Sequence, residues 1–261
     1  MEPYEVAEET FVIPGGLPVP TIGLLPVNAM IIRGEEPMLL DTLATVQREE
    51  FLQKAFSIVE PEDVRWIFIS HEDRDHSGSL GVLLERCPNA KIITNFLGLG
   101  KLSEEFEIPP ERAYFLNDGD TLTLGDRTLT AVRPPLYDSS ATRGLFDSKT
   151  GVYFSADCFG AVVQDLVQYT DELSAKDFEE GFFWMNRVNH VWFHHIPPAV
   201  IEETAIHVRQ LNPSQIVSGH GPTARHNPLQ MCDWITNIGD MDPVAMPSQD
   251  DFERMLAGGP E

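Results

Sequence analysis

The 261-residue chain is strongly acidic but of ordinary hydrophobicity. It carries 41 Asp and Glu against 18 Lys and Arg, a formal net charge of −23, and 42% of its residues are hydrophobic. This charge argues against a nucleic-acid partner, because phosphate binding requires clustered Lys and Arg. No apolar stretch is long and uninterrupted enough to predict a membrane helix. The length predicts one large domain with an ample core, or a domain with appendages.

Strands and helices are predicted to alternate along most of the chain. The predicted strands cover 10–13, 29–33, 37–41, 64–70, 91–94, 121–124, 127–133, 143–147, 152–155 and 214–217. The predicted helices cover 45–59, 79–86, 97–104, 173–195 and 198–211. Hairpins alternating with helices favour two sheets with helices outside.

The last part of the chain has a different composition. Residues 240–261 are rich in Pro, Asp and Gly around one short amphipathic piece from Phe252 to Leu256. Such a segment buries little apolar surface. We therefore predict a domain over 1–239 and a loosely packed C-terminal tail over 240–261.

The densest cluster of metal-binding residue types is His71-Glu72-Asp73-Arg74-Asp75-His76. It follows the apolar, β-branched strand at 64–70 and precedes a predicted helix. Open α/β sheets place their sites at such strand ends. Two His and two Asp in six residues can collect two metal ions. The alternative is a charged surface loop that caps a helix.

Two later strands each end in one more candidate ligand. The strand at 152–155 leads into Asp157, and the strand at 214–217 leads into Gly219-His220-Gly221-Pro222. A carboxylate has two oxygens and can bridge two cations. Taken alone, Asp157 could instead cap a helix and His220 could be a turn residue.

The donor types indicate which metals such a site would prefer. A set of histidines and several carboxylates is rich in oxygen, which suits iron or manganese better than zinc, although zinc also binds carboxylates. The three cysteines lack metal-site spacing. Cys158, beside Asp157, is predicted to be buried packing. Of His190, His194 and His195, in an aromatic segment, one could lie near the metals and influence their ligands.

These pieces resemble the metallo-β-lactamase superfamily, and within it the diiron domain of the flavodiiron proteins and the related oxygen-binding diiron proteins. The superfamily motif is His-x-His-x-Asp-His, and flavodiiron domains put a carboxylate in place of the second His. Here the motif reads His-x-Asp-x-Asp-His, with Asp73 at that position. The resemblance covers about residues 25 to 225 and implies an α/β fold, the four-layer αββα metallo-β-lactamase sandwich.

The resemblance also implies a role for each ligand. His71 and Asp73 would bind the first metal, Asp75, His76 and His220 the second, and Asp157 would bridge them. The family has a third terminal ligand on the first metal, a His, where this chain has Asp138. Either Asp138 or Tyr137 replaces it, or the first metal is weakly held or absent. An Asx-turn is as good an explanation of Asp138.

The expected cofactors are therefore two metal ions, iron in the first place with manganese and zinc as alternatives, and no flavin. Flavodiiron proteins reduce O2 or NO with electrons from a flavodoxin domain, which this sequence does not show. Three functions stay open: an O2- or NO-reactive reductase or O2 sensor served by a separate flavoprotein or rubredoxin donor, a metal-dependent hydrolase of an ester or phosphoester, or a non-catalytic member of the superfamily.

The expected setting is the cytoplasm. An odd number of cysteines without a pattern favours a reducing compartment, and the acidic N-terminus does not have the features of a signal peptide. We expect a small-molecule ligand or substrate and neither a nucleic-acid nor a membrane partner. A homodimer is left open.

Overall fold

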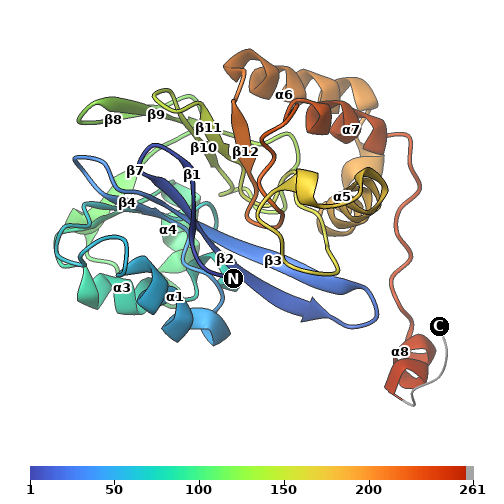
Figure 1. Ribbon diagram of the computed structural model, residues 1–261, viewed down its shortest axis with the longest axis horizontal. Helices are drawn as coiled ribbons and strands as arrows, with labels where there is room; N and C mark the ends of the chain where they lie inside the picture. The colour runs from blue at the N-terminus through green and yellow to red at the C-terminus, as the bar shows by residue number, and fades with distance from the viewer. Residues whose placement is uncertain (257–261) are drawn as a thin grey trace.

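Two β-sheets lie face to face in the computed structural model, which describes residues 1–256 (Figure 1). The seven-stranded sheet has the order β1-β2-β3-β4-β5-β6-β7 and the five-stranded sheet the order β12-β11-β10-β9-β8. The strands are β1 Tyr4–Ala7, β2 Thr10–Val19, β3 Gly23–Ile32, β4 Met38–Leu40, β5 Trp66–Phe68, β6 Lys91–Thr94, β7 Ala113–Phe115, β8 Thr121–Leu124, β9 Arg127–Val132, β10 Gly144–Asp147, β11 Val152–Phe154 and β12 Gln215–Val217.

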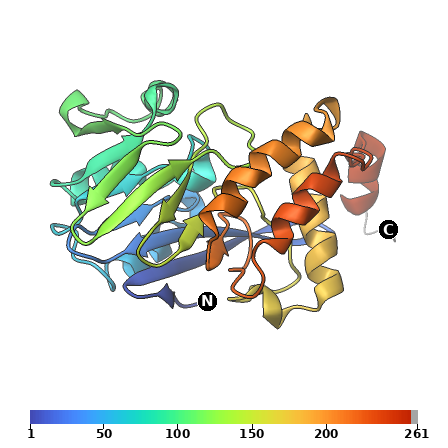
Figure 2. The same ribbon diagram turned by 90° about the horizontal axis from the view of Figure 1, so that it is seen from above.

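Helices cover the outer faces of both sheets. The α-helices are α1 Arg48–Ala55, α2 Arg74–Ser77, α3 Leu80–Arg86, α4 Phe96–Leu102, α5 Ala175–Asn189, α6 Pro198–Leu211, α7 Gln230–Ile238 and α8 Gln249–Leu256; the 3-10 helices are η1 Thr45–Gln47, η2 Pro110–Arg112, η3 Thr170–Glu172 and η4 Phe193–His195. Figure 2 shows α5, α6 and α7 grouped beside the smaller sheet. Within residues 1–256, no helix has the length and apolar character needed to cross a bilayer.

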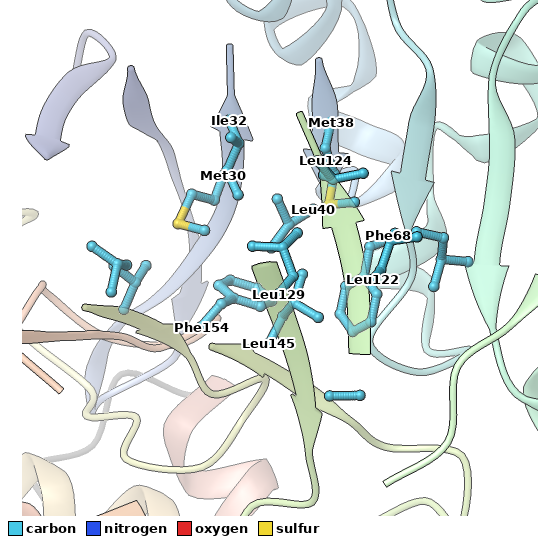
Figure 3. Packing of buried hydrophobic residues seen from close by; sticks show 14 of the residues in the cluster. Met30, Ile32, Met38, Leu40, Phe68, Leu122, Leu124, Leu129, Leu145 and Phe154 are labelled. Carbon is cyan, nitrogen blue, oxygen red and sulfur yellow. The ribbon is translucent and has the colours of Figure 1, made fainter. Parts of the chain in front are cut away.

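Three apolar clusters hold the four layers together. One lies between the sheets, one between the larger sheet and helices including α1 and α3, and one between the smaller sheet and α5 to α7. In Figure 3 the side chains between the sheets come from both of them: Met30, Ile32, Met38, Leu40 and Phe68 on one side, and Leu122, Leu124, Leu129, Leu145 and Phe154 on the other. Alternating burial along β8 and β9 directs these residues inward.

Several predicted boundaries were wrong. The strands predicted at 10–13 and 29–33 are parts of one long hairpin, β2–β3, paired from Thr10↔Ile32 to Val19↔Gly23. Prolines at 14, 18 and 26 lie within its two strands. They are tolerated because β1 and β4 pair only with its base, so none of the three prolines occupies a position in the ladder with either neighbouring strand.

Other differences concern helices. The helix predicted at 173–195 ends at Asn189, and the one predicted at 45–59 begins as η1 and ends at Ala55. The prediction did not include β1, β7, α2 or α7. In the predicted tail, α8 has no buried residue, and Figure 1 shows it apart from the sheets. The tail and domain boundary stay predictions, and their last five residues lie outside the described part of the chain.

Phe154 offers a test of the packing between the sheets, because its ring is fully buried. Phe154→Ala should lower the free energy of unfolding by about 3–5 kcal/mol. Phe96→Ala is the matched control, since that ring is 73% exposed and should cost no more than about 1 kcal/mol. Urea unfolding measures both values, and equal losses would contradict the arrangement of layers.

Candidate dimetal site

The His-x-Asp-x-Asp-His segment follows β5 and folds into the short helix α2, which the sequence prediction had treated as loop. Asp73 stands just before the helix, and Asp75 and His76 lie within it. The hydroxyl of Ser77 donates to the carbonyl oxygens of Glu72 and Asp73 at 2.9 and 3.0 Å. These bonds keep the segment tightly turned, so that its His and Asp side chains converge.

Three overlapping groups place donor atoms within 4.8 Å of one another. The first group joins His71, Asp73 and Asp138, and its His71 Nε2 lies 3.8 Å from Asp73 Oδ2 and 3.9 Å from Asp138 Oδ1. The second group joins Asp75, His76 and His220, with 3.3 Å between His220 Nε2 and Asp75 Oδ2.

Asp157 joins the two groups. Its Oδ1 lies 3.6 Å from His71 Nε2, 2.9 Å from His76 Nε2 and 3.4 Å from His220 Nε2. Its other oxygen, Oδ2, accepts a hydrogen bond from Asn189 Nδ2 at 2.8 Å. One oxygen is thus fixed by an amide, and the other faces the three histidines. All seven residues proposed from the sequence therefore lie in one cluster.

Tyr137 was the alternative to Asp138. Its ring lies 5.6 Å from the Trp192 ring and 5.1 Å from the Arg133 guanidinium. Asp138, by contrast, has an oxygen within 4 Å of His71. The geometry thus favours Asp138 as the oxygen donor beside His71.

Each of the three histidines is held through its other ring nitrogen. His76 Nδ1 lies 2.7 Å from Asp41 Oδ2, and Asp41 also accepts from the backbone and hydroxyl of Ser70 at 2.7 Å each. His71 Nδ1 lies 3.1 Å from Ser70 Oγ, and His220 Nδ1 lies 2.8 Å from the Pro26 carbonyl oxygen. Such partners fix the orientation of imidazoles that bind metals.

The chain around the cluster adopts unusual backbone angles. Asp41, Ala156 and Phe159 have φ values of 56°, 52° and 67°, in the left-handed region that non-glycine residues rarely enter. Such strain persists only where the surroundings enforce it, and it gathers at functional sites. Here it turns the chain just after β4 and on either side of Asp157.

Burial and mutual charge shift the pKa values in opposite directions. Burial alone would lower the pKa of His76, but Asp157, Asp41 and Asp75 raise it well above its usual value. Burial would raise the pKa of Asp157, but His71, His220 and His76 hold it well below its usual value. Asp73 differs, because burial and the nearby Asp138 and Asp157 raise its pKa. Without metal, protons on imidazoles balance the buried carboxylate.

The donor set fits two divalent cations. His71 Nε2 is buried and has no hydrogen-bond partner within residues 1–256, which is costly unless an ion satisfies it. The first group is the more open one: 51% of the Asp73 side chain and 22% of the Asp138 side chain are exposed. The histidines of the second group are at most 3% exposed in their side chains.

Some residues that support the cluster could not be recognised from the sequence. Asn189 lies 32 positions from Asp157, at a helix end that the prediction had placed elsewhere. Asn28 joins the β2–β3 hairpin to the His220 turn by donating to the carbonyl oxygens of Ser218 and Gly221 at 2.9 and 2.7 Å. The prediction that Cys158 is buried packing is confirmed.

Two sheets between helices, with His and Asp donors gathered where strands of both sheets end, define a metallo-β-lactamase fold with a candidate metal site. The chain belongs to the ODP family of beta-lactamases, whose family model matches residues 26–221. The resemblance noted in the sequence is thereby confirmed.

Two curated proteins are similar in sequence to a large part of this chain. The rubredoxin-oxygen oxidoreductase of Megalodesulfovibrio gigas is 28% identical over 166 residues, 62% of this chain and 41% of that protein. The anaerobic nitric oxide reductase flavorubredoxin of Salmonella typhi is 26% identical over 206 residues, 78% of this chain and 42% of that protein. The chain thus spans less than half the length of these relatives.

Solved structures confirm the predicted four-layer αββα sandwich. The rubredoxin oxygen:oxidoreductase of Desulfovibrio gigas superposes with a TM-score of 0.79 at 20% identity, covering 91% of this chain and 60% of that one. The flavodiiron protein of Giardia intestinalis gives 0.80 at 17% identity, covering 92% and 59%. At these identities the likeness shows the fold alone.

The Asp41–His76 contact predicts an effect on metal affinity. Asp41→Asn keeps the size of the side chain but removes the charge that orients the His76 ring. We expect metal affinity to fall by about 10–100-fold. Competition with a chelator measures it. Glu60→Gln, an exposed carboxylate on the loop after α1, is the control and should leave affinity unchanged; an equal effect of both substitutions would refute the orienting role.

The pKa shifts predict how pH affects the metal-free protein. The pKa of His76 is higher in the folded protein than in the unfolded chain. Its protonation therefore stabilises the folded protein fully at pH values below the pKa of the unfolded chain, and this stabilisation is lost as pH rises through the pKa of the folded protein. The lowered pKa of Asp157 adds stability that is present above its unfolded pKa and lost as pH falls through the folded pKa. Chelator-treated protein should therefore lose stability as pH rises above neutral.

Bound metal should reduce this loss of folding stability at high pH, because the cations replace the protons on the imidazoles. Urea unfolding of chelator-treated and metal-loaded protein, compared between about pH 6 and 9, measures the difference. A metal-free protein whose stability stays flat over that range would contradict the charge balance described above.

Proposed function

We propose that this chain is a dimetal protein, with iron as its metal pair, that binds or reduces O2 or NO. The observation that carries the proposal is the oxygen-rich first group, in which two carboxylates, Asp73 and Asp138, face the single imidazole of His71. With Asp157, three of the four donors there are carboxylates, a set that suits iron or manganese better than zinc. The printed names of the relatives, an oxygen oxidoreductase and a nitric oxide reductase, support the same class of ligand.

The proposed ligands divide between two metal positions. His71, Asp73 and Asp138 would hold the first ion, Asp75, His76 and His220 the second, and Asp157 would be shared by both. When bound, a pair of reduced irons supplies the electrons for reduction of a small molecule. The protein residues hold the pair close together, and the buried imidazoles of His76 and His220 shield one side of it from bulk water.

The difference in exposure indicates where a small molecule would enter. Half of the Asp73 side chain is exposed at the first position, whereas the most exposed ligand of the second, Asp75, is 25% exposed and its two imidazoles are buried. We therefore infer that O2 or NO reaches the pair from the Asp73–Asp138 side.

The electrons are proposed to come from outside the residues described here. A rubredoxin-type or flavoprotein donor is the natural class, given the names of the relatives. In an O2 sensor, by contrast, binding alone would be the signal. The supply of electrons therefore separates the reductase and sensor forms of the proposal.

O2 uptake by iron-loaded, chemically reduced protein tests the function. Conversion of O2 to water needs four electrons, and a reduced iron pair gives two on becoming oxidised. Uptake at an oxygen electrode should therefore stop after a single burst. A reduced rubredoxin or flavoprotein should restore turnover in a reductase, and NO with the same donor should give N2O measurable by gas chromatography.

His220→Ala is the matched control for this assay, since it removes a ligand of the second position without touching the open side. It should lose both iron and the burst. The proposal fails if loaded, reduced wild-type protein shows neither O2 uptake nor a change in optical spectrum. Rapid hydrolysis of a phosphodiester by zinc-loaded protein would then favour the hydrolase.

A further inference from the structure

His190, at the end of α5, is a buried imidazole beside the cluster that the ligand assignment above does not use. Its side chain is fully buried, and its Nδ1 lies 2.9 Å from the Asn186 carbonyl oxygen. A carbonyl oxygen only accepts hydrogen bonds, so Nδ1 carries the proton of the neutral ring. Nε2 therefore presents a bare lone pair.

That lone pair has no hydrogen-bond partner within residues 1–256. A buried polar atom without a partner costs about 1–3 kcal/mol. Of the three histidines in this segment, His190 alone is buried, since His194 and His195 are exposed. A ring that served only for packing would not require a nitrogen at this position.

The residues next to His190 in the sequence contact the shared carboxylate and the segment that carries Asp138. The preceding residue, Asn189, donates to Asp157 Oδ2 at 2.8 Å. Two residues later, Trp192 Nε1 donates at 3.0 Å to the carbonyl oxygen of Tyr137, which precedes Asp138. His190 is thus held between the shared carboxylate and the Asp138 segment.

The arrangement of its ring matches that of His220. In both residues Nδ1 faces a backbone carbonyl oxygen, at 2.8 Å in His220 and 2.9 Å in His190. Nε2 of each ring is then the nitrogen whose lone pair can bind a metal ion. Metal-binding histidines ordinarily have this arrangement. Burial lowers the pKa of His190, against the opposing effect of Asp157 and Asp138, so the ring is suited to act as an uncharged donor.

We propose that His190 Nε2 is a second nitrogen donor to the first metal position, beside His71. This inference rests on the proposed metal pair. It explains how a position otherwise built from one imidazole and carboxylates can hold its ion. His190 is not among the donor groups that lie within 4.8 Å in the metal-free arrangement, so the ring and the Asp138 segment must move closer when the ion binds.

Nitrogen NMR of the wild-type protein tests the proposal without any substitution. Zinc ion is the probe, because it is diamagnetic and binds imidazole well. On addition of two equivalents, the Nε2 resonance of His190 should move together with those of His71, His76 and His220, while Nδ1 keeps its proton. A His190 Nε2 resonance that stays at its metal-free position while the other three move would overturn the proposal.

A pair of variants gives a second, independent measurement. His190→Ala should weaken one of two zinc-binding steps, by more than the roughly 10–100-fold typical of an outer partner, and leave the other step unchanged. His195→Ala, which removes an exposed ring from the same segment, is the control and should bind like wild type. Two unchanged steps in His190→Ala would also overturn the proposal.

These results separate the inference from the function on which it rests. If zinc binds in two steps but His190 does not respond, only the inference fails. If the wild-type protein binds no metal pair at all, the proposed function fails as well. Neither measurement depends on O2 or NO chemistry.

Discussion

The structure depends on one buried negative charge. Asp157 is 3% exposed and lies among three imidazoles, each of which is buried. A carboxylate in such surroundings cannot remain without positive charge, because the cost of removing it from water is several kcal/mol. Protons can supply that charge, as the raised pKa values of His76 and His220 show, and metal ions can supply it as well. The surrounding fold serves to keep this charge in place.

The two donor groups differ because they are built from different parts of the chain. The second combines residues of α2 with His220, whose turn is held by the β2–β3 hairpin through Asn28 and Pro26. The first relies on Asp73 and Asp138, which lie on more exposed segments. The group with more buried and better supported side chains is therefore the more rigid one, and the group containing Asp73 is the more accessible one.

Features encoded by a short stretch of sequence could be predicted, and features set by contacts between distant segments could not. The motif at residues 71–76 concentrates its donors in one turn, and Asp157 and His220 end strands of recognisable pattern, so the cluster could be assembled from the sequence. The length of the β2–β3 hairpin could not, because its prolines are tolerated only where neighbouring strands leave an edge free. The end of α5 was placed wrongly because it depends on packing, which local pattern does not encode.

The linear order of the donors has a consequence for how the protein is made. His76 and His220 lie 144 positions apart and meet only when β12 has joined β11 in the smaller sheet. During synthesis, the early histidines emerge long before their partner, so a nascent chain offers an incoming ion only part of the closed position. The complete group of Asp75, His76 and His220 is therefore a property of the nearly complete fold, and no early segment of the chain contains it. In the proposed dimetal protein, an ion held there would connect α2 with the turn after β12 and so stabilise the pairing of that strand with β11.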